Sequence, residues 1–225
     1  MTSTNRTLVI MAKAPRVGSV KTRLAVDLSL QQARELYACL LNDTIALAQA
    51  LERVEIAMMC PESDVEDLSH SVTEAVLIVP QTGRGLAAGL TSVFAHFTNS
   101  GHQRVIAFNS DSPHLPASVL ENAFDLLETC DLVVGPTHDG GYYLVGAKVS
   151  QADLFSNDGM GTANALEALL TRARALGLSV HLTEPFYDID VAADLMQLAD
   201  ELQRIPGKAP RTAKWLSEWA SARHQ

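Results

Sequence analysis

The chain has 225 residues, of which 47% are hydrophobic and 19% charged, and this composition excludes a disordered chain, a collagen-like repeat and a coiled coil. Its formal net charge of −9 argues against a general nucleic-acid-binding protein, since such proteins neutralise phosphates with basic side chains. No apolar run reaches the roughly 18 residues that span a bilayer, and the three separated cysteines fit neither a disulfide framework nor a zinc site. We therefore expect a cytoplasmic protein with no nucleic-acid partner and no membrane partner.

The charge is unevenly distributed along the chain. Residues 1–26 contain five basic residues and no acidic one, whereas the rest of the chain contains 12 basic and 26 acidic residues. This asymmetry predicts a compact anion-binding site in the first segment.

Hydrophobic runs bounded by turn residues predict the strands of a sheet. In chain order these runs are 7–12, 54–59, 76–79, 104–108, 132–135, 142–147 and 179–182. Helical spacing of apolar residues predicts helices over about 29–51, 85–97, 118–128, 162–176, 191–203 and 212–223. Strands joined by crossover helices predict an α/β three-layer sandwich with a mainly parallel sheet. The Asp139-Gly140-Gly141 turn predicts an antiparallel pair, which makes the sheet mixed.

The chain shows no internal repeat and no low-complexity boundary, which predicts one domain over 1–225 with 204–225 as a C-terminal helical extension. In open sheets of this kind, ligands bind outside the carboxyl ends of the strands. The loops that follow the strands are therefore the places to search for functional residues.

The loop after the first strand carries the basic cluster. Its candidate phosphate-binding residues are Lys13, Arg16, Gly18, Lys21, Thr22 and Arg23. Lysine supplies a compact charge, arginine grips two oxygens, and glycine lets the backbone approach a ligand. The spacing is not that of a Walker loop. The alternative is a solvated basic loop.

Acidic residues follow two later strands. Asp111, at the carboxyl end of strand 104–108, is placed to hold Mg²⁺ or Mn²⁺ against phosphate oxygens, or else forms an Asx turn or helix cap before Pro113. Asp188 and Asp190 fall on one side of an extended segment and form a second candidate ligand pair. Asp190 alternatively caps the helix that begins near residue 191.

Three further segments could contact substrate. The candidate acceptor-binding residues are Asp139, Gly140, Gly141, Tyr142, Gly161 and Thr162. The first four also read as a plain hairpin turn, and Thr162 reads as the N-cap of a helix whose exposed amides could receive an anion. Arg84, in the glycine-rich loop before another helix, could reach a base or a phosphate.

Taken in order, four motifs carry a family resemblance. They are residues 11–18 with Lys21-Thr22-Arg23-Leu24, then 110–113, then Gly135-Pro136 with 139–143, then Asp188-Ile189-Asp190. Together they resemble radical-SAM/selenodomain-associated transferase family 1, a GT-A-like family described as glycosyltransferases within the nucleotide-diphospho-sugar transferase superfamily. The chain is also similar to 2-phospholactate guanylyltransferase, which shares a Lys-Thr-Arg-Leu type loop.

This resemblance implies a mixed sheet of about seven strands, with a nucleotide pocket over its first half and an acceptor pocket over its second. It also implies that Lys13, Lys21 and Arg23 face phosphates and that Asp111 binds the divalent cation. Lys21 and Asp111 are then the candidate catalytic residues.

We expect a Mg²⁺- or Mn²⁺-dependent transferase that takes a nucleotide-activated donor and a small-molecule acceptor. Glycosyl transfer from a nucleotide-sugar is the first hypothesis. Nucleotidyl transfer from a nucleoside triphosphate to a phosphorylated small molecule is the second, and a non-catalytic nucleotide-binding module is the third. Association into a homo-oligomer stays open.

Overall fold

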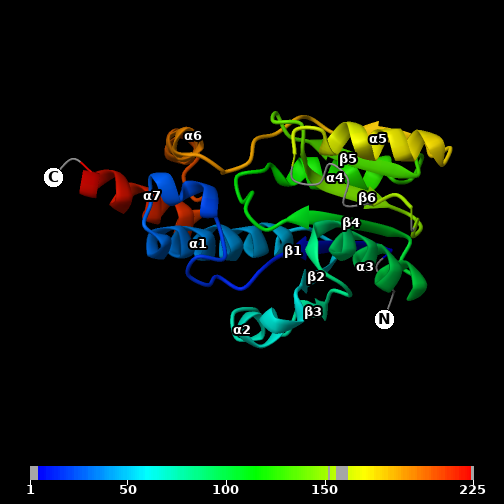
Figure 1. The fold of residues 1–225 in the computed structure, drawn as a ribbon, viewed down its shortest axis with the longest axis horizontal. Helices are drawn as coiled ribbons and strands as arrows, with labels where there is room; N and C mark the ends of the chain where they lie inside the picture. Colours follow the sequence, from blue (N-terminus) through cyan, green and yellow to red (C-terminus); the bar gives the residue numbers. More distant parts are fainter. Residues whose placement is uncertain (1–4, 152, 156–161, 224–225) are drawn as a thin grey trace. The chain divides into compact units, whose positions relative to one another are not determined.

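The computed structural model describes residues 5–151, 153–155 and 162–223, which group into two compact units. Unit 1 comprises residues up to 14, 51–109 and 116–187; unit 2 comprises 15–50, 110–115 and 188 onward. Figure 1 shows both units and labels most of their helices and strands. Residues 204–223 belong to unit 2, and their assignment as an extension of a single domain stays a prediction.

Unit 1 contains the sheet. Its strands are β1 (Arg6–Met11), β2 (Glu55–Cys60), β3 (Leu77–Pro80), β4 (Arg104–Asn109), β5 (Leu132–Pro136), β6 (Tyr142–Ala147) and β7 (Val180–Leu182). They form a seven-stranded sheet in the order β3-β2-β1-β4-β6-β5-β7. Only β6 runs antiparallel to its neighbours, with Val145 opposite both Ala107 and Val134. The predicted mixed, mainly parallel sheet is therefore confirmed, including the antiparallel pair.

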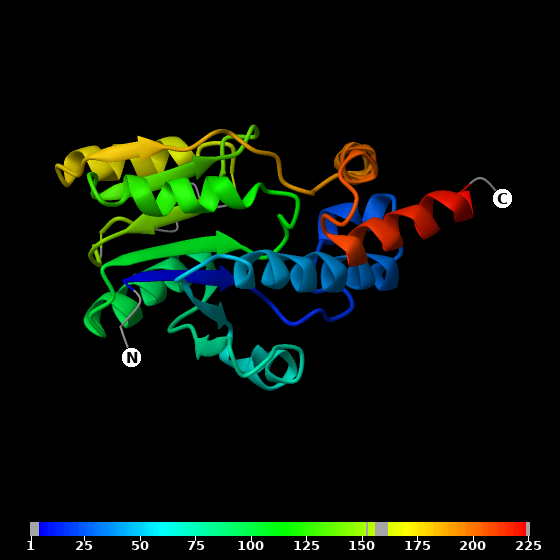
Figure 2. The same cartoon turned by 180° about the vertical axis from the view of Figure 1, so that it is seen from behind.

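Helices cover both faces of this sheet, as the views from opposite sides in Figures 1 and 2 show. The helices of unit 1 are η2 (Glu62–Asp64), α2 (Val65–Ser69), α3 (Gly85–Asn99), α4 (Ala117–Leu126) and α5 (Ala165–Ala175). Residues of α3 and α5, including Phe94 and Leu169, join one buried cluster with alternate residues of the strands. On the opposite face, the side chains of Ile106 and of Leu127, which follows α4, both lie close to Gly146.

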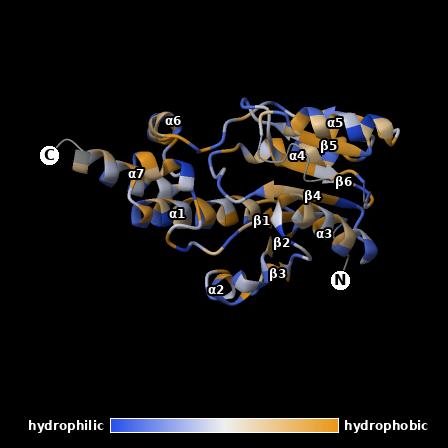
Figure 3. Ribbon diagram, in the orientation of Figure 1, coloured by the Kyte–Doolittle hydropathy of each residue, from blue (hydrophilic) through white to orange (hydrophobic). Residues whose placement is uncertain are grey.

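The central strands are buried on both sides. In β1 and β4 the four middle residues of each strand are buried, as expected for strands covered by two helix layers. Figure 3 shows the matching band of hydrophobic colour along the central strands. Uninterrupted apolar runs made these strands readable from the sequence.

Unit 2 is helical in the part that the structure describes. It contains η1 (Thr22–Val26), α1 (Leu30–Gln49), α6 (Ala192–Arg204) and α7 (Pro210–Arg223). Ser29 caps α1: its hydroxyl accepts from the Gln32 amide, and the Gln32 side chain accepts from the Ser29 amide. Sequence periodicity did not predict the short helices η1, η2 and α2, each of five residues or fewer.

The predicted N-cap at Thr162 is wrong. Helix α5 begins at Ala165, and its N-cap residue is Asn164. The hydroxyl of Thr162 instead accepts from the Asn164 amide, at 3.2 Å, in a turn before the helix. The carbonyl of Gly140 accepts from the Leu166 amide at 3.0 Å, so the 139–141 turn satisfies one of the amides of the first helical turn.

Candidate functional site

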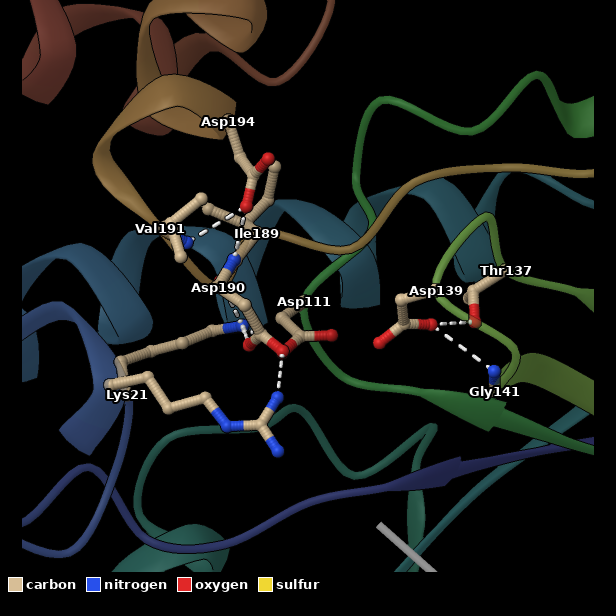
Figure 4. Close-up of polar contacts among 10 residues, drawn as sticks. Lys21, Asp111, Thr137, Asp139, Gly141, Ile189, Asp190, Val191 and Asp194 are labelled. Atoms are coloured by element: carbon tan, nitrogen blue, oxygen red, sulfur yellow. Dashed lines mark hydrogen bonds and ion pairs between the residues drawn. The ribbon is translucent and has the colours of Figure 1, made fainter. Parts of the chain in front are cut away.

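Lys21 is the centre of a charged cluster in unit 2 (Figure 4). Its ammonium forms an ion pair with Asp111, donates to the carbonyl of Ile189 at 2.7 Å, and lies 3.7 Å from a carboxylate oxygen of Asp190. The Lys21 side chain is only 6% exposed. The expected convergence of the basic loop and Asp111 on one site is therefore present.

Arg23 adds a second cation to this cluster. Its guanidinium donates to the other carboxylate oxygen of Asp190 at 2.7 Å. The side chain of Arg23 is 61% exposed, against 33% for Asp190, so this pair borders the solvent. Arg23 is therefore the more accessible of the two cations to an incoming anion.

The charge of Lys21 follows from its surroundings. Burial by itself would lower the pKa of the ammonium, but the adjacent carboxylates of Asp111, Asp190 and Asp188 outweigh it and hold the pKa above its usual value. Lys21 is thus a buried, permanently charged group at neutral pH. Asp188 acts on the ammonium through its charge, whereas Asp111 and Asp190 form ion pairs with it.

Each partner of Lys21 is held by an element of its own. Ser110, next to Asp111, shares a buried 2.8 Å hydrogen bond with the hydroxyl of Tyr37 on α1. The carboxylate of Asp194 on α6 accepts from the amides of Asp190 and Val191, both at 2.8 Å (Figure 4).

Asp194 thus takes the capping role that was the alternative for Asp190. The other alternative, Asp111 as a helix cap, does not hold either, since the N-cap of α4 is Pro116. Neither carboxylate is thus the N-cap of a helix, and the Asx turn at Asp111 stays a prediction.

The oxygen atoms around Lys21 suit a hard cation. Two carboxylates and one carbonyl surround its ammonium, and oxygen atoms are the ligands that Mg²⁺ and Mn²⁺ take. No group of three acidic, histidine or cysteine side chains with metal-site geometry occurs among the described residues. The donor chemistry thus fits a divalent cation held by two carboxylates together with oxygens of a bound phosphate.

The other predicted phosphate-binding residues are exposed. Arg16, Gly18 and Thr22 lie in unit 2 on the surface of the loop that leads to η1. Lys13 and Arg84 lie in unit 1, where Arg84 is the N-cap residue of α3. Their exposure leaves them open to a ligand, and their role stays a prediction.

Sequence reasoning missed Asp64, which fixes the start of the basic loop in unit 1. Its buried carboxylate accepts from the backbone amide of Ala14 at 2.8 Å and from the hydroxyl of Ser63 at 2.9 Å. Asp64 and Tyr37 lie 50 or more positions from the groups they hold, and no local spacing marks such pairs.

The predicted acceptor-binding turn in unit 1 is tightly organised. One carboxylate oxygen of Asp139 accepts from the Thr137 hydroxyl at 2.5 Å and from the Gly141 amide at 3.1 Å (Figure 4). Gly140 has φ +87°, and a Cβ there would stand 2.0 Å from the carbonyl oxygen of Ala163. This position therefore requires glycine for packing, whatever its role with substrate.

The remaining acceptor candidates are less informative. Tyr142 is half-buried, and burial raises the pKa of its phenol. Thr162 is exposed in unit 1, and Gly161 lies outside the described residues. None of the described helices is long and apolar enough to cross a membrane.

Comparisons with known proteins place these features in context. Residues 44–162 match the family described as "Uncharacterized protein conserved in bacteria" (DUF2064). The chain is 24% identical over 193 residues to 2-phospho-L-lactate guanylyltransferase of Methanocaldococcus jannaschii, covering 84% of this chain and 81% of that protein. It is 25% identical over 195 residues to phosphoenolpyruvate guanylyltransferase of Sphaerobacter thermophilus, covering 86% and 93%.

A solved structure shares the fold. A protein of Desulfovibrio desulfuricans G20, provisionally assigned as a nucleotide-diphospho-sugar transferase, superposes with a TM-score of 0.89 at 23% identity and covers 96% of both chains. The fold implied by the sequence motifs is therefore confirmed, as is the similarity to guanylyltransferases.

Proposed function

Because this chain belongs to the bacterial family DUF2064 and matches two guanylyltransferases over more than four-fifths of its length, we propose that it is a nucleotidyltransferase. It joins a nucleoside triphosphate, with GTP the first candidate, to a small phosphorylated acceptor. The observation that carries this proposal is the cluster of Lys21 and Arg23 against Asp111 and Asp190. The narrower assignment to radical-SAM/selenodomain-associated transferase family 1 is part of the same proposal.

In this reaction an oxygen of the acceptor phosphate attacks the α-phosphorus of the triphosphate. A new P–O bond forms, the bond from the α-phosphorus to the bridging oxygen breaks, and pyrophosphate leaves with the electron pair. Arg23 and Lys21 would stabilise the negative charge that builds on the leaving group. A divalent cation bound by Asp111, with Asp188 or Asp190, would neutralise charge on the phosphate oxygens. Arg16, on the same loop of unit 2 as Lys21, would add a cationic contact to the donor.

A panel assay tests this proposal. The protein is incubated with Mg²⁺, one of the four nucleoside triphosphates, and 2-phospholactate or phosphoenolpyruvate, and pyrophosphate is measured. We expect release that requires both a triphosphate and an acceptor. In a parallel incubation with nucleotide-sugars in place of the triphosphate, release of a nucleoside diphosphate would point instead to glycosyl transfer. No turnover with any donor would contradict both reactions and favour a binding module.

The variant Asp111→Asn links turnover to the cluster. We expect it to lower kcat by at least about 100-fold, because the carboxylate charge at the reacting phosphates is lost. Asp125→Asn is the matched control, since Asp125 forms a surface ion pair with Arg6 in unit 1. Circular dichroism spectra that match the unsubstituted protein show that both variants fold. Full activity of Asp111→Asn would contradict the site.

A further inference from the structure

The side chain of Lys21 is less exposed than expected for a lysine that binds phosphate. A lysine that waits for an anion in solvent is exposed, whereas the Lys21 side chain is 6% exposed and its ammonium contacts three oxygen acceptors (Figure 4). Those acceptors come from the 110–115 and 188–190 segments. Lys21 thus joins two segments of unit 2 that lie far apart along the chain.

The backbone at Lys21 is also unusual. It has φ 48° and ψ 39°, in the left-handed region that non-glycine residues rarely adopt. No side-chain hydrogen bond caps η1 at this position. The contacts of the ammonium are therefore the evident compensation for this conformation.

The balance of charge around Lys21 favours exchange of cations. Three carboxylates, of Asp111, Asp188 and Asp190, act on the ammonium, and Arg23 is the second cation beside them. Removing the ammonium without replacement would leave three negative groups together. Oxygen atoms of this kind are also the ligands that a divalent cation prefers.

We propose that Lys21 is the resident counter-ion of the Asp111 and Asp190 carboxylates in the free enzyme, and that it leaves them when a divalent cation binds. The freed ammonium then turns to the phosphates of the donor. Binding of the metal and availability of Lys21 for the donor are thereby coupled. This inference rests on the proposed function, because it assigns a sequence of events to the same site.

Chemical labelling of the unsubstituted protein tests the exchange directly. The nucleotide-free protein is pulsed with acetic anhydride with and without Mn²⁺, and acylation of each lysine is measured by peptide mass spectrometry. Lys208, which lies 3.8 Å from Glu201 and is 19% exposed, is the paired reference; Lys214, at 77% exposure, is the open reference. We expect Mn²⁺ to raise labelling of Lys21 severalfold and to leave both references unchanged. Equal labelling of Lys21 with and without Mn²⁺ would overturn the proposal.

The affinity for Mn²⁺ provides a second test, measured by electron paramagnetic resonance without nucleotide. Lys21→Met removes the competing ammonium and should lower the Kd for Mn²⁺ about tenfold, because the carboxylates no longer have to release a bound cation before the metal binds. Lys208→Met is the matched control and should not change the Kd, while Lys21→Arg should keep it near the unsubstituted value. An unchanged or higher Kd in Lys21→Met would contradict the exchange.

Two features keep these outcomes interpretable. Adding Asp111→Asn to Lys21→Met should abolish the gain in Mn²⁺ affinity, because the gained binding depends on that carboxylate. If Lys21→Met does not fold, the labelling experiment still decides the question. Neither measurement uses nucleotide, so a failed donor panel would sink the proposed function alone, and turnover without exchange would sink this inference alone.

Discussion

The hydroxyl of Tyr37 anchors the residue that precedes Asp111. It bonds to the Ser110 side chain at 2.8 Å, and both residues are buried in unit 2. A buried hydroxyl pair of this kind is costly to leave half-satisfied, so it restricts the loop that carries Asp111. Tyr37 acts through Ser110 and is therefore a positioning residue for the proposed reaction.

Tyr37→Phe should lower the free energy of unfolding by about 1 kcal/mol and kcat by about tenfold, because Ser110 loses a partner and Asp111 loses its fixed position. Urea titration and the pyrophosphate assay measure the two effects. Ser110→Ala and the double variant complete a cycle, in which we expect a coupling energy of about 1 kcal/mol. Additive effects, or full turnover in Tyr37→Phe, would show that the bond does not position Asp111.

For single residues, the sequence predicts which charged side chains belong to the site better than it predicts the groups that they contact. Lys21 and Asp111 were predictable because both follow parallel strands, whose carboxyl ends share one edge of a sheet. The contact of Lys21 with the Ile189 carbonyl was not predictable, since it spans 168 positions and involves the backbone. The same holds for the roles of Tyr37 and Asp64.

Among the elements, α7 begins without a capping residue of its own. Its preceding residue, Ala209, has φ 44° and no side-chain acceptor. The fully buried carboxylate of Asp43 on α1 substitutes for it, accepting from the Thr212 amide at 2.8 Å and the Thr212 hydroxyl at 2.9 Å. Arg211 forms an ion pair with Asp43 at 3.2 Å. The negative charge of Asp43 also interacts favourably with the positive end of the helix dipole at the start of α7.

Asp43→Ala should therefore destabilise unit 2 by about 2–4 kcal/mol, because two buried donors of Thr212 lose their acceptor. Asp43→Asn keeps an oxygen acceptor and should lose about half as much stability as Asp43→Ala. Denaturant unfolding and amide exchange of 210–215 report the change. The control Asp125→Ala breaks a surface pair and should stay within about 0.5 kcal/mol. An equally small loss of stability in Asp43→Ala would show that Asp43 does not cap α7.

Elements with long apolar patterns were predictable, and their ends were less so. The strands β1, β2, β4, β5 and β6 follow from runs of buried residues, and α1 follows from Ser29 and its helical spacing. Thr162 failed as a cap because the Gly140 carbonyl and the Asn164 turn set the start of α5. Short helices such as η1 contain too few residues to show the helical periodicity of apolar side chains.

For the whole molecule, the order of elements predicted the fold class, because alternating strands and helices leave few arrangements with right-handed crossovers. The grouping of residues into two compact units was not predictable, since each unit combines segments from distant parts of the chain.

The pH dependence of the free energy of unfolding is the sum of contributions from the titratable groups whose pKa differs between the folded and the unfolded chain. At alkaline pH, the contribution of one such group, Cys60 at the end of β2, can be measured.

Burial, reinforced by the charge of Asp64, raises the pKa of the Cys60 thiol from 9.0 to about 11. Between these values the unfolded chain loses the proton and the folded chain keeps it, so the free energy of unfolding falls as pH rises, by at most about 1.4 kcal/mol per pH unit from this group. Below pH 9 the thiol is protonated in both states and contributes no slope.

Cys60→Ala isolates this contribution, because the other titrating groups cancel when the variant is subtracted from the unsubstituted protein at each pH. Guanidinium unfolding at pH 8, 9.5 and 11 should give a stability difference that shrinks as pH rises, since only the unsubstituted protein loses the thiol contribution. Met58→Leu, a buried neighbour on the same strand without a titrating group, should give a constant difference. A constant difference for Cys60→Ala as well would mean that the folded chain releases the thiol proton as readily as the unfolded one.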